Sequence, residues 1–177
     1  MSPVSFGAAA RILAERDPVI ARLVAGAGPP RLSRPTESHF GTLVRAIVYQ
    51  QLAGRAAAAI HGRLIAAVGG HVLPEPLLAL TDEQMRAVGL SRNKMASLRD
   101  LAARVLDGTV VLSSRGLARE SDDEIIARLS AVRGIGPWTA EMFLIFQLRR
   151  LDVWPGRWRP GTAGGLRNCT RARRTAR

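Results

Sequence analysis

The arrangement of this chain is decided by residues 129–141, which read LSAVRGIGPWTAE. One helical segment ends here in a Gly-x-Gly turn, and a second helix begins directly after it. Gly134 and Gly136 let the backbone turn tightly and approach another surface closely. The exposed amides of a helix that begins at Pro137 favour an anion such as a DNA phosphate. A tight turn without any ligand explains the two glycines as well, so both interpretations stay open.

Helical periodicity continues over most of the chain on both sides of this turn. Capping boxes that begin at Thr81 and at Ser121 mark two helix starts, and Thr36 or Ser38 is expected to cap another. The one strand candidate, residues 109–112, is short, so the predicted fold class is all-α. We expect helices over about residues 6–25, 37–52, 55–68, 81–89, 91–107, 121–132 and 138–148.

Composition and charge narrow the function classes only moderately. The chain has 177 residues, which suits one domain, and it shows neither an apolar run long enough to span a membrane nor the layout of a signal peptide. Its single cysteine, Cys169, excludes an internal disulfide and a cysteine-ligated cluster. We therefore expect a cytoplasmic protein with no membrane partner. The formal charge of +12 favours an anionic partner such as nucleic acid.

The last part of the chain differs sharply from the rest. From Gly156 onward there are seven arginines and no acidic residue, and removing those seven from the net charge of +12 leaves about +5 for the remainder. The segment has no apolar periodicity and is rich in Gly, Arg, Ala and Thr. We expect residues 156–177 to be a disordered tail and residues 1–155 to form the folded domain.

Four stretches carry the motifs that identify a family, and they are residues 46–52 (AIVYQQL), 89–94 (GLSRNK), 129–141 and 151–155 (LDVWP). In this order they resemble the helix-hairpin-helix (HhH-GPD) DNA glycosylases, and GIGPWTAE particularly resembles the 3-methyladenine DNA glycosylase II family. The resemblance covers most of residues 35–155. It implies an all-α helix-hairpin-helix glycosylase bundle. It also implies a monomeric, monofunctional enzyme of base excision repair that hydrolyses the N-glycosidic bond of alkylated purines, 3-methyladenine foremost, in double-stranded DNA.

The resemblance assigns DNA-binding roles to the hairpin. Gly134, Gly136 and the amides near Thr139 would hold a phosphate, while Arg133 would either add a phosphate contact or be solvated. No cofactor is required by the family's reaction. A structural monovalent cation would bridge to the same phosphate, coordinated by three backbone carbonyls, those of Ser130, Val132 and Ile135.

Trp138 and Gln51 are the side chains to which the resemblance gives a part in base extrusion. Trp138 would line the pocket for the flipped base, because an indole suits a cationic alkylated purine; packing in the core is the alternative. Gln51 would fill the gap that the extruded nucleotide leaves in the duplex, or would bond to the backbone at its helix end. Bifunctional members have a lysine at the position of Trp138, so lyase activity is not expected.

The chain departs from the family where the catalytic aspartate is expected. That carboxylate would stabilise an oxocarbenium-like transition state and steer water, and it should follow Pro155 within a few positions. No acidic residue occurs from Gly156 to Arg177. Reading the codons of residues 156–160 from their second base permits Val-Gly-Gly-Asp-Leu. We hypothesise that residues 156–177 are translated out of frame, so that the glycosylase domain is incomplete, truncated at its C-terminus and impaired in catalysis.

Two other functional classes fit the same motifs. A non-catalytic DNA-binding protein would use the hairpin only to grip phosphates, and would bind a duplex without releasing a base. A gene remnant would be recognised by its insolubility. The three histidines show no metal-ligand spacing and are expected to be surface or locally bonded residues; they are His39, His61 and His71.

Overall fold

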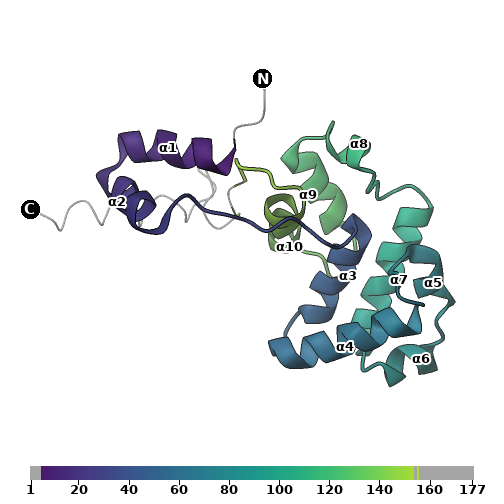
Figure 1. Cartoon of the computed structure of the whole chain (residues 1–177). Helices are drawn as coiled ribbons and strands as arrows, with labels where there is room; N and C mark the ends of the chain where they lie inside the picture. Colours follow the sequence, from purple (N-terminus) through teal and green to yellow (C-terminus); the bar gives the residue numbers. More distant parts are fainter. Residues whose placement is uncertain (1–4, 154, 156–177) are drawn as a thin grey trace, which may run out of the picture.

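The computed structural model describes residues 5–153 and 155, which form helices joined by turns (Figure 1). The all-α fold class is confirmed, since no strand occurs among these residues. The predicted tail, residues 156–177, lies outside the described residues. In chain order the helices are α1 (Phe6–Arg16), α2 (Pro18–Ala27), α3 (His39–Tyr49), α4 (Gly54–Ala67), α5 (Pro74–Ala79), α6 (Asp82–Ala87), α7 (Arg92–Leu106), α8 (Ser114–Leu117), α9 (Asp122–Ser130), α10 (Pro137–Met142) and the π-helix η1 (Phe143–Gln147).

Helices α1 and α2 form a helical hairpin that stands apart from the other helices (Figure 1). The prediction of a single helix over residues 6–25 is therefore wrong. Pro18 lacks the N–H that a helix interior needs and disfavours a helical backbone at the residue before it. Asp17 accordingly has an extended backbone and caps α2, accepting hydrogen bonds from the N–H groups of Val19 at 2.7 Å and Ile20 at 3.2 Å.

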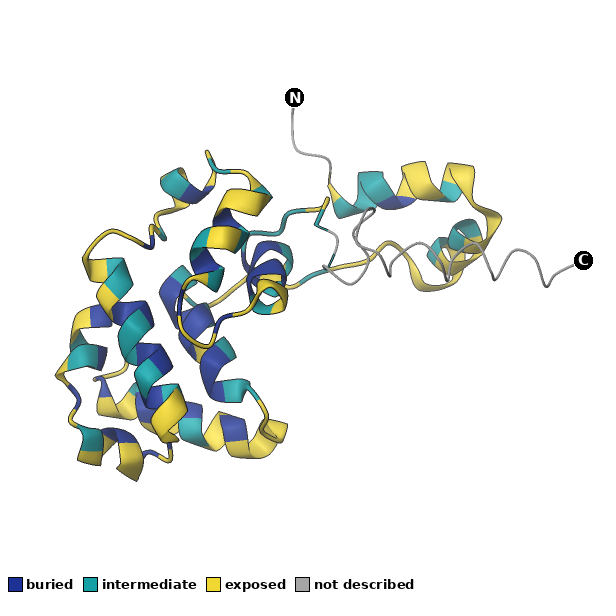
Figure 2. Ribbon diagram, turned by 180° about the vertical axis from the view of Figure 1, so that it is seen from behind, coloured by how far each residue is buried: buried dark blue, intermediate teal, exposed yellow. Residues whose placement is uncertain are grey.

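Helices α3 to η1, which we call the body, pack around one apolar core, seen in Figure 2 as the buried faces of these ribbons. Helix α3 contacts α4, α7 and η1, and its buried stripe is spaced as an amphipathic helix requires. The core thereby fixes α3, α7 and η1 relative to one another. The apolar side chains of that stripe are Phe40, Leu43, Val44, Ile47 and Val48.

Local capping signals are confirmed in the body. Ser38 rather than Thr36 caps α3, and its hydroxyl accepts a hydrogen bond from the N–H of Gly41 at 3.0 Å. The capping boxes predicted to begin at Thr81 and Ser121 are both formed, at the starts of α6 and α9. Each of these signals involves residues three positions apart, so they act independently of the rest of the fold.

The strand candidate at residues 109–112 does not form a strand, in agreement with the all-α prediction, and the chain there is bent or irregular. The N–H of Val110 donates to the carbonyl of Arg104 at 2.8 Å, which folds the chain back over the end of α7. Val110 is buried and Leu112 is partly buried against the core, and α8 follows a few residues later. The short helices α5 and α8, of 6 and 4 residues, are missed from sequence because neither is long enough to show a period.

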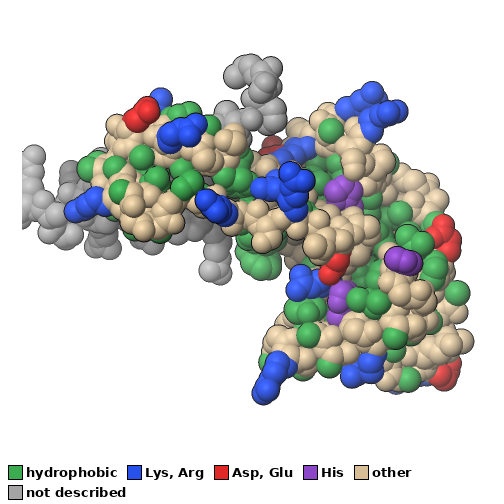
Figure 3. All heavy atoms as spheres, in the orientation of Figure 1, with side chains coloured by type: hydrophobic (Ala, Val, Ile, Leu, Met, Phe, Trp, Pro, Cys, Tyr) green, Lys and Arg blue, Asp and Glu red, His purple; other side chains and the backbone are tan. Residues whose placement is uncertain are grey.

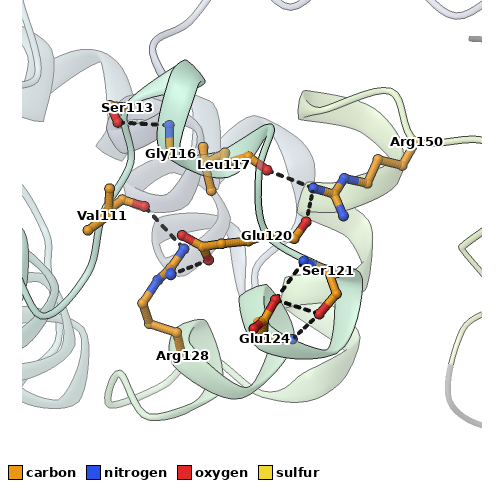
Figure 4. Close-up of polar contacts among 9 residues, drawn as sticks. All are labelled: Val111, Ser113, Gly116, Leu117, Glu120, Ser121, Glu124, Arg128 and Arg150. Atoms are coloured by element: carbon orange, nitrogen blue, oxygen red, sulfur yellow. Dashed lines mark hydrogen bonds and ion pairs between the residues drawn. The ribbon is translucent and has the colours of Figure 1, made fainter. Parts of the chain in front are cut away.

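The junction of α8 and α9 holds the chain that leaves η1 (Figure 4). The guanidinium of Arg150 donates to the carbonyls of Leu117 and Glu120, both at 2.7 Å, and pairs with Asp122 at the start of α9. Arg128 pairs with Glu120 beside it. These contacts between residues about thirty positions apart set the direction in which the chain continues after Arg150.

Candidate functional site

A groove of about 790 Å³ opens between α3, α10 and η1, within the size range of small-molecule sites. Four of the lining residues are aromatic. Arg45 carries a positive charge, and the other described lining residues are uncharged. On the face seen in Figure 3, basic side chains are spread over both the α1–α2 hairpin and the body. The aromatic lining residues are Tyr49, Trp138, Phe143 and Phe146.

Trp138 lies in the first turn of α10 and points away from the core. Its exposed fraction is 66%, which excludes the alternative of core packing. Thr139 is half-buried and lines the groove next to it. Trp138 therefore lies on an open surface beside the groove, and the fold adds a second exposed aromatic residue, Phe146, that sequence reasoning missed. Phe146 belongs to the π-helix, whose wider turn no local sequence signal predicts.

Gln51 follows α3 at the edge of the groove and is exposed. Its backbone has a φ of 56°, a left-handed conformation that is unusual for a residue other than glycine. For Gln51, a hydrogen bond to the backbone was the alternative role. Gln50, the residue before it, makes such a bond: its side-chain amide donates to the carbonyl of Gly134 at 2.8 Å. The end of α3 is thus tied directly to the glycine turn before α10.

The glycine turn is held against α7. Gly134 has a φ of 79°, and a Cβ at this position would lie 2.5 Å from the hydroxyl of Ser97. Its lack of a side chain is therefore explained by packing inside the protein. Gly136 has an ordinary φ of −94° and open space around it. Arg133 is exposed, and its backbone N–H donates to the carboxylate of Asp100 at 2.8 Å.

The three carbonyls assigned to a cation lie on one short run from the end of α9 to the turn. Helix α9 ends at Ser130, and the carbonyl of Val132 accepts a hydrogen bond from the N–H of Ile135 at 3.1 Å. The hydroxyl oxygen of Ser130 is buried without a hydrogen-bond partner. A neutral oxygen left unpaired at this point fits an oxygen-coordinated cation close by.

Lys94, the chain's only lysine, joins the start of α7 to the end of α3. Its ammonium group donates to the carbonyl of Val48 at 2.6 Å, where the negative end of the α3 dipole also favours a cation. Desolvation lowers the pKa of Lys94 below its usual value. Sequence reasoning named Lys94 within a motif but gave it no role, because its partner lies 46 residues away.

The histidines are placed differently from one another. His39 shares hydrogen bonds with Ser114 at 3.2 Å and Gln147 at 3.0 Å, as a locally bonded residue would. His61 is buried and its Nε2 has no hydrogen-bond partner, which differs from the expected surface or locally bonded residue, and it packs edge-on against Tyr49 with ring centroids 6.0 Å apart. Burial lowers the pKa of both His39 and His61. In the part of the chain that the structure describes, no group of three or more His, Cys, Asp or Glu side chains could hold a metal ion.

Comparisons with known proteins bear on this site. A family model described as HhH-GPD superfamily base excision DNA repair protein matches residues 44–167. DNA-3-methyladenine glycosylase 1 of Schizosaccharomyces pombe is 39% identical to this chain over 128 residues, which cover 71% of this chain and 56% of that protein. The chain thus spans little more than half of that relative's length.

Solved structures show a similar arrangement of helices. The crystal structure of a DNA-3-methyladenine glycosidase from Bacillus halodurans has a TM-score of 0.73 and 36% identity, covering 80% of this chain and 64% of that one. The 3-methyladenine DNA glycosylase of Schizosaccharomyces pombe in complex with abasic DNA has a TM-score of 0.68 and 37% identity, covering 83% and 73%. Among the described residues, no helix is long and apolar enough to cross a membrane.

Proposed function

Since this chain belongs to the HhH-GPD superfamily of base excision DNA repair proteins, we propose that it binds double-stranded DNA and receives a flipped alkylated purine in the groove beside Trp138. The names of its relatives make 3-methyladenine the first candidate base. The reaction is hydrolysis of the N-glycosidic bond. Trp138 stands where a lyase needs a lysine, so no Schiff base forms.

The exposure of Trp138 is the observation that carries this proposal. An indole that is 66% exposed beside an aromatic groove leaves a large apolar face uncovered, and such a face usually belongs to a binding site. A planar purine that stacks on the indole covers that face. Positive charge on an alkylated base strengthens the stacking through cation–π attraction.

Two parts of the chain hold the duplex while the base is extruded. Gly136 and Thr139 present the start of α10 to a phosphate, and Arg133 adds a basic side chain nearby. Gln51 fills the gap in the duplex from its strained, exposed position. The hydrogen bond from Gln50 to Gly134 joins the two parts, so that the phosphate contact and the gap-filling side chain act together.

A monovalent cation fits the turn between α9 and α10. The carbonyls of Ser130, Val132 and Ile135 would hold it, and when bound it supplies positive charge opposite the DNA phosphate. The unpaired hydroxyl of Ser130 supports this assignment. The turn itself is positioned by Asp100, which accepts from the N–H of Arg133.

Catalysis requires a carboxylate near the sugar, because positive charge develops there as the base departs. The described residues that line the groove include none, and the sequence contains none from Gly156 to Arg177. We therefore expect the chain with its present C-terminal residues to bind a lesion but to release the base poorly. A gene whose shifted frame restores the aspartate should encode an efficient enzyme.

The test measures binding and base release separately. The full chain is titrated against two duplexes that differ only in one base, which is 7-methylguanine on a hydrolysis-resistant 2′-fluoro sugar in the first and guanine in the second, and we expect tighter binding of the damaged one. Trp138→Ala should weaken that binding about tenfold or more, and Trp138→Phe should retain most of it, because base–aromatic stacking is worth about 1–3 kcal/mol. Leu23→Ala, on the exposed face of α2, is the control and should change nothing.

Base release is then measured on alkylated DNA with the chain as it stands and with the shifted-frame C-terminus. Release of 3-methyladenine only by the second form supports both parts of the proposal. Equal binding of both duplexes, unaffected by Trp138→Ala, would favour a protein that only grips phosphates.

A further inference from the structure

We propose that the ion pair between Arg45 and Glu37 sets the charge preference of the groove. Arg45 disfavours a cationic base and Glu37 offsets it, so that the intact pair lets the groove accept cationic and neutral lesion bases alike. The inference rests on the proposed function, since it concerns the base bound in that groove.

Arg45 is placed at the wall of the groove by α3. Its guanidinium carbon lies 4.7 Å from the ring centroid of Tyr49, and both residues line the groove. The Nε of Arg45 lies 3.7 Å from a carboxylate oxygen of Glu37. One cation thus contacts an aromatic wall on one side and a carboxylate on the other.

Glu37 reaches Arg45 because Gly41, which lies between them, has no side chain. Glu37, Gly41 and Arg45 are four residues apart and share one side of the chain that enters and forms α3. Gly41 carries no side chain, and a Cβ there would lie only 3.7 Å from the Cβ of Glu37 and 3.9 Å from its Oε2. The carboxylate can therefore lie along the helix start.

The carboxylate of Glu37 and the guanidinium of Arg45 differ in how freely each can move. The side chain of Glu37 is 34% exposed and its Oε2 is buried without a hydrogen-bond partner, whereas the side chain of Arg45 is 52% exposed. The carboxylate is thus the more confined partner, and the guanidinium can move aside when a base enters. His61 stands near both and contacts Tyr49. Burial lowers the pKa of His61, so at neutral pH its ring adds no third charge.

The charge of Arg45 acts directly on a bound base, because the other described lining residues of the groove are uncharged. Two like charges within one Debye length repel each other, and more strongly beside apolar walls than in bulk water. Arg45 also covers one face of the Tyr49 ring, which leaves less aromatic surface for a cationic base. Removing Arg45 should favour cationic bases, and neutralising Glu37 should disfavour them.

The test compares two duplexes whose single modified base differs in charge but hardly in shape. One carries 7-methylguanine on a 2′-fluoro sugar, which is cationic and resists hydrolysis, and the other carries the neutral 7-deaza-7-methylguanine. We expect Glu37→Gln to lower the ratio of cationic to neutral affinity about three- to tenfold, and Arg45→Gln to raise it by a similar factor. Both shifts should shrink as salt is added. The exposed Arg55→Gln on α4 is the matched control and should leave the ratio within about twofold.

Binding alone is read out, so the test does not depend on base release. Thermal unfolding of each variant verifies that the fold is kept. Shifts of both variants in the same direction, or ratios within about twofold of the unmodified chain, would overturn the inference if that chain still prefers either lesion to undamaged DNA. Failure of the unmodified chain to prefer either lesion would instead overturn the proposed function, and the inference with it.

Discussion

The α1–α2 hairpin and the body are built from similar helices, but they differ in how many residues those helices bury. Both contain apolar residues at helical spacing, but α1 buries only Ala10 and α2 buries no residue, while α3 alone buries six. Four apolar residues of the hairpin are exposed, namely Ile12, Leu13, Val19 and Leu23. In Figure 2 the hairpin ribbon has mostly the colours of exposed and intermediate residues. Helical periodicity therefore indicates that a helix has an apolar face, but not that another part of the chain covers it.

The attachment of the hairpin is correspondingly light. Arg149 places its guanidinium 5.7 Å from the ring centroid of Phe6 and donates to the carbonyl of Leu32 at 3.3 Å. Arg149 itself has a positive φ of 58°. In the body, by contrast, Gln147 bonds to Thr42 at 2.8 Å across 105 residues of sequence. The body is held by packing and buried hydrogen bonds, which cooperate in a way that the contacts of one half-buried arginine cannot.

The largest expected effect comes from the same substitution made in both regions. Leu98 is fully buried in α7 and Leu23 is 64% exposed on α2. Leu98→Ala should lower the free energy of unfolding by about 3 kcal/mol, because it removes buried contacts and leaves a cavity. Leu23→Ala should change it by less than about 0.5 kcal/mol. Urea unfolding followed by circular dichroism gives both values, and equal costs would show that the α2 face is covered in solution.

An intermediate effect separates the two glycines of the turn. Gly134→Ala should cost about 2 kcal/mol, because it combines a positive φ with a Cβ too close to Ser97. Gly136→Ala has room and an ordinary φ, so it should cost less than about 1 kcal/mol. Adding Ser97→Ala should restore part of the loss in the first variant only. A similar cost for both glycines would mean that contact with α7 does not hold the turn.

The smallest expected effect is the pH dependence of the body. Burial lowers the pKa of His39 and His61 in the folded chain below the ordinary value of 6.5. As the pH falls below about 6.5, the unfolded chain takes up these protons first, so the body loses stability until the folded pKa values are reached. The hairpin contains no histidine and should not share this loss.

Amide hydrogen exchange at several pH values, corrected for the intrinsic exchange rate, measures the two regions separately. The stability of the body should fall by less than about 1 kcal/mol for each histidine between pH 6.5 and 5. His61→Gln should flatten this slope, and the exposed His71→Gln should leave it unchanged. A slope that is identical in the hairpin would contradict the assignment to buried histidines.

The sequence by itself determined what depends on neighbouring residues. Ser38, Thr81 and Ser121 cap helices, and Gly134 turns the chain, because each signal acts over about three residues. The overlooked break at Pro18 is local as well and could have been found from the sequence. The exposed position of Trp138 was not determined in this way, because the sequence left packing in the core open as the alternative and Ala140 in the same turn is buried.

Only the tertiary structure decided which distant residues meet. The bond of Gln50 to Gly134 spans 84 residues, and that of Lys94 to Val48 spans 46. The burial of His61 against Tyr49 and the change from α10 to a π-helix likewise have no local signal. Such contacts depend on how whole helices pack, and packing is a property of the complete core rather than of any short stretch of sequence.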